Sequence, residues 1–131
     1  MSTEFDSTVA VERDAARLPD SVLDVGGIEP EKYPGCTIFS YFNGPTDQLS
    51  GVSTGMAVLD PGARPHEPHR HPEEEFMIVA AGTGEIVCGE TTTAVGPGSI
   101  MYCAGNTLHG IANTGKVPMT FYWSKWTARG F

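Results

Sequence analysis

Four histidines and one glutamate are the residues of this chain whose types and spacing could do chemistry. Three of the histidines, His66, His69 and His71, lie within one short stretch, and His109 lies far downstream. His69 and His71 are two residues apart, so both imidazoles point to one face if the segment is a β-strand. Glu75 follows four residues after His71. Imidazole nitrogens with one carboxylate oxygen suit Zn, Fe, Mn, Ni or Cu better than Ca or Mg.

The stretch around the first three histidines resembles the first sequence motif of the cupins. That motif is a glycine, an H-x-H pair, a glutamate and a second glycine, and it is matched here by Gly62, His69, His71, Glu75 and Gly82. The six residues between Glu75 and Gly82 fit the motif. The gap between Gly62 and His69 is one residue longer than usual.

The stretch around the fourth histidine resembles the second cupin motif. It runs through Gly98, Ala104, Asn106, His109 and Asn113. Ala104 and Asn106 stand where the motif has a proline and a glycine. These two departures concern a turn of the motif. His109 still matches the motif's histidine, which the resemblance implies is a metal ligand.

The resemblance covers about residues 36 to 126 and carries several expectations. It implies an all-β, single-domain cupin β-barrel (a double-stranded β-helix, or jelly roll). It also implies that His69, His71, Glu75 and His109 bind one divalent transition metal ion. It does not specify the reaction, because cupins include oxygenases, decarboxylases, isomerases, lyases and binding proteins.

The elements that must position these residues are short strands. From residue 36 onward, β-branched and aromatic runs alternate with turn signals rich in glycine, proline and asparagine. Spacing of roughly 8 to 12 residues is typical of an all-β sandwich or barrel. Besides the histidine segment, we expect strands at 36–42, 52–59, 76–81, 85–88, 91–95, 99–103, 108–112 and 117–126. In the last of these, period two places Met119, Phe121 and Trp123 together on the core side.

The N-terminal third is more polar. We expect residues 1–35 to form an arm that belongs to the same domain as the barrel of residues 36–131. Within the arm, residues 7–13 suit a short strand and residues 13–18 a single helical turn.

Composition limits the function further. A chain of 131 residues is one domain. Its formal net charge of −8 argues against nucleic acid, since no basic stripe could neutralise phosphates. No apolar run reaches the roughly 20 residues that cross a bilayer, and the acidic start does not resemble a signal peptide. Three widely spaced cysteines do not suggest a disulfide framework, so we expect a reducing cytoplasm.

Several further side chains are candidates for the surroundings of the metal. On a regular strand His66 faces away from the ligands, where it could line the rim or contact substrate, or simply occupy a proline-flanked loop. Glu73 and Glu74 are expected to be solvated or ion-paired. Candidates for an apolar substrate pocket, although core packing explains each equally well, are Tyr41, Met56, Tyr102 and Trp123.

Four protein ligands on an ion that accepts five or six leave open positions, as in a catalytic site. The leading hypothesis is a dioxygenase-type oxidoreductase acting on a small organic molecule, with Glu75 also catalytic. One alternative is a metal-dependent isomerase, lyase or decarboxylase acting on a sugar-like or keto acid. The other is a non-catalytic cupin that binds a small ligand. Because open strand edges need covering, we also expect a homodimer.

Overall fold

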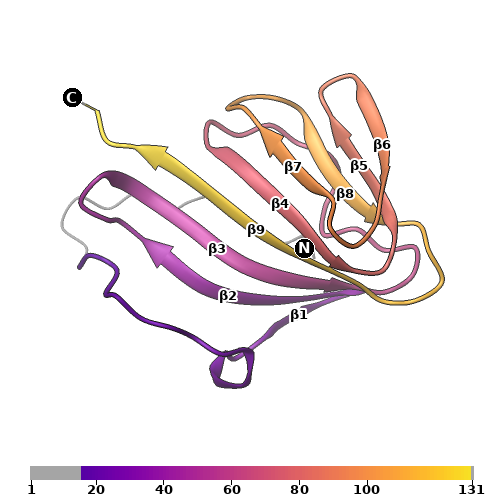
Figure 1. The fold of residues 1–131 in the computed structure, drawn as a ribbon, viewed down its shortest axis with the longest axis horizontal. Helices are drawn as coiled ribbons and strands as arrows, with labels where there is room; N and C mark the ends of the chain where they lie inside the picture. The colour runs from indigo at the N-terminus through magenta and orange to yellow at the C-terminus, as the bar shows by residue number, and fades with distance from the viewer. Residues whose placement is uncertain (1–15, 131) are drawn as a thin grey trace.

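The computed structural model describes residues 16–130, almost all of whose regular structure is β-strand (Figure 1). The strand expected at 7–13 lies outside these residues, and no helix is present at 16–18. The elements in chain order are η1 (Val25–Gly27), β1 (Glu31–Tyr33), β2 (Cys36–Gly44), β3 (Leu49–Leu59), β4 (Glu74–Ala81), β5 (Gly84–Cys88), β6 (Thr91–Val95), β7 (Ile100–Cys103), β8 (His109–Asn113) and β9 (Met119–Ala128). No helix in this part of the chain is long and apolar enough to cross a membrane.

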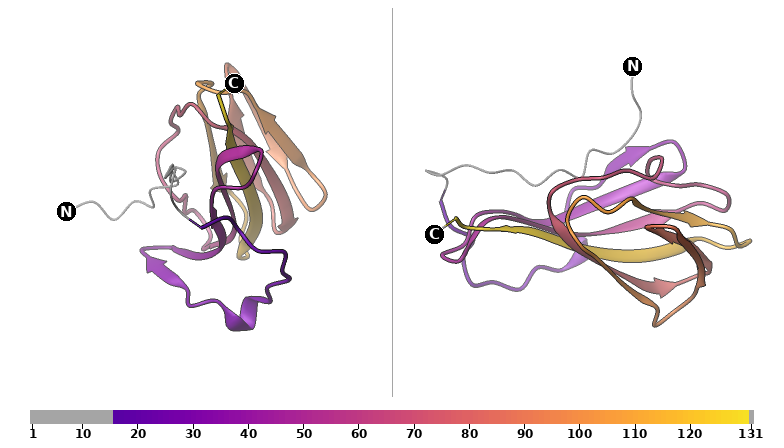
Figure 2. Two further views of the ribbon diagram at one scale, coloured as in Figure 1. Left: turned by 90° about the vertical axis from the view of Figure 1, so that its left-hand side faces the viewer. Right: turned by 90° about the horizontal axis from the view of Figure 1, so that it is seen from above.

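The strands form two antiparallel sheets. One has the order β1-β2-β3-β9-β4-β7, and the other has the order β6-β5-β8. Figures 1 and 2 show the larger sheet curving along the length of the molecule, with the smaller one beside its β4–β7 end. The prediction of an all-β fold built from short strands is confirmed. β1, which lies within the range assigned to the arm, pairs with β2.

The core lies between the two sheets and follows the period-two rule. Met119, Phe121 and Trp123 of β9 are all at most 3% exposed, as their alternation predicted. Met77 and Val79 of β4 face the same side. Further core residues come from the other strands: Cys36, Ile38, Ala57, Leu59, Ile86, Met101, Cys103 and Ile111.

The turn before β8 explains how the chain departs from the second motif without losing the fold. Asn106, which replaces a glycine, has a φ of 62°. Asparagine tolerates this left-handed conformation better than most residues do. The Asn106 N–H donates to the backbone oxygen of His71 at 2.7 Å. The turn therefore joins the two motifs directly.

The histidine segment is a loop rather than the regular strand we expected. Its one strand-like contact is an isolated bridge in which His69 and His109 exchange two backbone hydrogen bonds of 2.9 Å. Prolines at 65, 68 and 72 explain the difference, because proline lacks the N–H that a strand ladder needs. At the bridge, a Cβ on Gly110 would lie 3.1 Å from Pro68, so glycine lets the loop approach β8 closely.

Candidate metal centre

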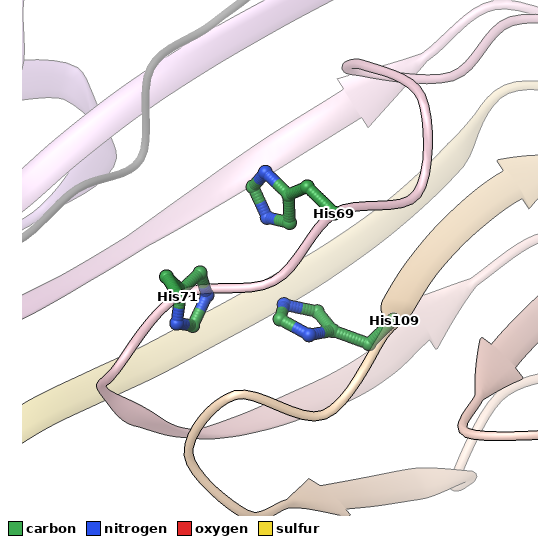
Figure 3. Close-up of side chains that lie close together, drawn as sticks. All are labelled: His69, His71 and His109. Atoms are coloured by element: carbon green, nitrogen blue, oxygen red, sulfur yellow. The ribbon is translucent and has the colours of Figure 1, made fainter.

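Three imidazoles converge on one point inside the barrel, as Figure 3 shows. One ring nitrogen from each of His69, His71 and His109 lies within 4.8 Å of the other two. The first two side chains come from the loop before β4, and His109 is the first residue of β8. His71 and His109 are 8% and 2% exposed. The loop thus brings His69 and His71 to one side, as a regular strand would also have done.

Glu75 meets the same cluster from β4. Its Oε1 accepts hydrogen bonds from Nε2 of His71 at 2.9 Å and from Nε2 of His109 at 3.1 Å. Its side chain is buried on the inner face of the larger sheet. The structure therefore places all four sequence-predicted ligands in one cluster, with donors from the loop, β4 and β8.

The backbone around the cluster fixes the orientation of two imidazoles. Nδ1 of His71 donates to the backbone oxygen of Glu73 at 3.1 Å, and Nδ1 of His109 donates to that of Thr107 at 2.9 Å. An Nδ1–H held on a carbonyl oxygen is the usual arrangement of a metal-bound histidine, because it turns the Nε2 lone pair toward the ion. An ion would bind on the Nε2 side of these two rings, where both Nε2 atoms now face Oε1 of Glu75. The residues present fit a divalent transition metal.

The pKa values of the residues in the cluster are shifted in different directions. Burial raises the pKa of Glu75, but hydrogen bonds from His109 and His71 and the charge of Lys125 outweigh it and lower this pKa to about 2. Burial, followed by the neighbouring His66, lowers the pKa of His69 to about 4. Burial also opposes protonation of His109, yet the hydrogen bonds to Glu75 and Thr107 leave its pKa raised. Glu75 is consequently an anion at any physiological pH, as a metal ligand must be.

Two buried charged residues lie beside the cluster. Glu73 is 3% exposed, with Oε1 at 3.5 Å from Nδ1 of His71, so of the two expected states, solvated or ion-paired, it is the paired one that the structure favours. Lys125 on β9 is 0% exposed and its Cα pairs with that of Glu75. The signal that could have found Lys125 is parity, because it is the next inward position after Trp123.

A pocket lies beside the cluster. His66 lines it and stacks on His69 with ring centroids 3.9 Å apart, so it does not face away as a regular strand would require. Trp123 also lines it, and its indole N–H donates to Ser53 Oγ at 3.1 Å. The remaining walls are Ile38, Pro65, His69, Glu75, Met77, His109, Gly110, Ile111 and Phe121.

The other three pocket candidates lie elsewhere. Tyr102 is 50% exposed on the outer face of β7, where its hydroxyl donates to Glu74 at 2.6 Å. Met56 has the outward parity of β3 and pairs with Tyr122. Tyr41 occupies the irregularity between Ser40 and Phe42 in β2. None of these three residues lines the cavity.

Solved structures share this fold. An RmlC-like cupin from Shewanella frigidimarina superposes with a TM-score of 0.71 at 15% identity, covering 85% of this chain and 94% of its own. A sugar phosphate isomerase of the cupin superfamily from Silicibacter pomeroyi gives 0.68 at 22% identity, over 84% and 76% of the two chains. The polyketide cyclase RemF from Streptomyces resistomycificus gives 0.68 at 18% identity, over 85% and 82%.

At these identities the superpositions show the fold alone. No curated protein matches the chain. The sequence of residues 55–125, more than half of the chain, matches the cupin domain family (Cupin_2). These residues include the whole cluster of imidazoles and Glu75. The chain belongs to the cupin family.

Proposed function

We propose that the protein is a metal-dependent enzyme that carries out a dioxygenase-type oxidation of a small organic molecule. The observation that carries this proposal is a cluster of three imidazoles and a carboxylate of which His69, His109 and Glu75 lie at the wall of a pocket. Such a donor set leaves coordination positions open for other molecules. A redox-active ion bound there would supply the activation of dioxygen, which no side chain of the cluster can supply.

The walls of the cavity define the class of substrate. Apart from the histidines and Glu75, the lining residues are apolar, and neither lysine nor arginine occurs among the described residues that form it. A phosphorylated sugar would find no lysine or arginine in this lining to pair with its charge. The lining supports a small, mostly apolar molecule that carries an enol, phenol or keto oxygen at one end.

The residues of the chain have distinct roles in this proposal. Ile111, Phe121 and Trp123 would pack against the apolar body of the substrate and exclude water. Glu75, held deprotonated by its neighbours, would accept a proton or a hydrogen bond from the substrate hydroxyl. His66, stacked on His69 at the wall, would contact the substrate without binding the metal.

A second candidate is a redox-neutral reaction, such as an isomerisation, elimination, decarboxylation or cyclisation of an enolisable molecule. The same anionic Glu75 could move a proton in such a reaction. The apolar cavity favours a substrate of the polyketide kind, like that of the structurally similar cyclase, over a sugar-like acid. A non-catalytic protein that binds a small ligand would use the same walls.

One experiment separates these functions. The protein is first loaded with Fe²⁺ under anaerobic conditions. It is then mixed, in the presence of oxygen, with small diketones, phenols and keto acids. Oxygen uptake and product formation are both measured. We expect oxygen uptake in proportion to the product. Product formed without oxygen would establish the redox-neutral reaction instead. Saturable binding without any product would establish a binding protein.

A further inference from the structure

Lys125 is the largest fully buried side chain among the described residues, at 0% exposure. It lies on the inner face of β9, where its Cα pairs with Glu75 of β4 on one side and with Ser53 of β3 on the other. Side chains that are directly opposite each other on an antiparallel pair have Cβ atoms about 4.5–5.5 Å apart. The register therefore places the lysine beside a carboxylate of the metal centre.

Its charge acts on ligands from both sheets. The charge of Lys125 contributes to the lowered pKa of Glu75 on the larger sheet, and it opposes the net rise in the pKa of His109 on the smaller one. Glu73, 3% exposed, places a carboxylate beside His71. Two carboxylates and one ammonium group thus surround the three imidazoles within the barrel.

Packing alone does not explain a lysine at this position. The preceding inward residues of β9 are Met119, Phe121 and Trp123, and a methionine at 125 would continue that apolar row at similar length. Burial of an ammonium group has a large desolvation penalty unless other charges compensate it. Glu75, directly opposite on β4, supplies a compensating charge, so the lysine belongs to the electrostatics of the cluster.

We propose that Lys125 is a positioning residue whose fixed positive charge raises the reduction potential of the metal centre and keeps its ion divalent. Loss of one electron takes the ion from +2 to +3. The electrostatic repulsion between the ion and the ammonium group of Lys125 rises in the same proportion, so the divalent ion is favoured. The effect is large in a buried site because water screens it poorly. This inference rests on the proposed function in requiring a redox-active ion.

The test uses the full chain loaded with Fe²⁺ and measures the midpoint potential of the one-electron Fe³⁺/Fe²⁺ couple by spectroelectrochemistry. Lys125→Met should raise the Fe³⁺/Fe²⁺ ratio at a fixed potential at least about tenfold, equivalent to a midpoint about 59 mV lower. Lys125→Arg, which keeps the charge, should stay close to wild type. Glu73→Gln, which removes a negative charge, should shift the midpoint in the opposite direction.

Zinc affinity, measured by chelator competition, shows independently whether each variant keeps its site. An unchanged midpoint in a Lys125→Met protein that still binds zinc overturns the inference. If that variant does not fold, Lys125→Gln replaces it with the same expectation, since its amide can donate hydrogen bonds without a charge. Wild-type protein that binds neither ion overturns the metal centre itself. A shifted midpoint without oxygen uptake on any substrate supports the role of Lys125 and contradicts the proposed oxidation.

Discussion

The two faces of β4 and β9 invert the usual distribution of side chains. On the inner face, Glu75 and Lys125 are 5% and 0% exposed beside apolar residues such as Met77. On the outer face, Phe76, Ile78 and Tyr122 are 37–40% exposed. Buried charges and exposed large apolar groups are the informative exceptions to the burial rule. The difference teaches that the two faces of one pair of strands differ in character, with charges gathered at the candidate metal centre inside and apolar side chains exposed outside.

The outer face is continuous across three strands. The ring of Phe76 lies 5.5 Å from those of both Tyr102 and Trp126. Ile100, on the edge strand β7, is 63% exposed.

We propose that a second copy of this chain covers this face in a homodimer, since a two-fold interface requires one self-complementary patch. Phe131, at the C-terminus, lies outside the described residues.

The largest expected effect concerns the inner face. His109→Ala should weaken binding of a divalent transition metal by more than about 100-fold, the upper end of what loss of a residue behind a ligand produces. His66→Ala is the matched control and should keep the affinity, because it stacks on a ligand without joining the cluster. Chelator competition measures both variants. Equal losses at the two positions would contradict the ligand assignment.

The next prediction concerns the charge of Glu75. Glu75→Gln keeps the shape of the side chain and removes the anion that faces the cavity. Turnover at saturating metal should fall at least about tenfold, equivalent to roughly 1.4 kcal/mol of barrier. Steady-state kinetics on protein shown to be metal-loaded measures this. Equal turnover in the two proteins would exclude a catalytic need for the carboxylate.

A third prediction tests the outer face. Wild-type protein should sediment near twice the 14.0 kDa mass of the chain at micromolar concentration. Phe76→Ser, which removes the ring between Tyr102 and Trp126, should raise the dimer dissociation constant at least about tenfold. Its metal affinity should stay intact, because Phe76 points away from the cluster. Thr92→Ser, on the exposed strand β6, is the control. If the wild-type protein sediments as a monomer, the proposed homodimer is wrong.

The smallest effect is expected from pH. In metal-free protein the pKa of His69 is lowered to about 4, so the folded state binds fewer protons than the unfolded state between about pH 6.5 and 4. The free energy of unfolding should therefore fall as pH decreases through this window. Protonation of Glu75 lowers the free energy of unfolding only as pH falls from about 4.3 toward 2.

Urea titrations at pH 6.5 and 4.5, with a chelator present, measure the effect. His69→Gln should show a smaller decrease between the two pH values than wild type. The difference should be modest because the His69 ring is only partly buried and solvent screens it. An identical decrease in both proteins would assign the pH dependence to other groups.

Local patterns predicted the strands, since period-two runs and turn residues act within a few positions of the chain. That the candidate ligands lie close together could also be predicted, because His69, His71 and Glu75 are close in sequence and His109 lies in a second recognisable motif. The positions of Met56 and Tyr102 could not, because each strand has two faces and only its neighbours determine which is inside. Parity could have placed Lys125 on the inner face, but not beside Glu75, which is 50 residues away in the chain.

The ligands of the cluster belong to different parts of the fold. His109 starts a strand of the smaller sheet, Glu75 lies in the larger one, and the histidine loop meets β8 at the bridge between His69 and His109. A bound ion would act as a removable cross-link between these parts. At a free concentration of 1,000 times its dissociation constant, it would add about 4.1 kcal/mol to the free energy of unfolding. The supply of metal would thus set how often the histidine loop opens, and how long the folded chain survives proteolysis.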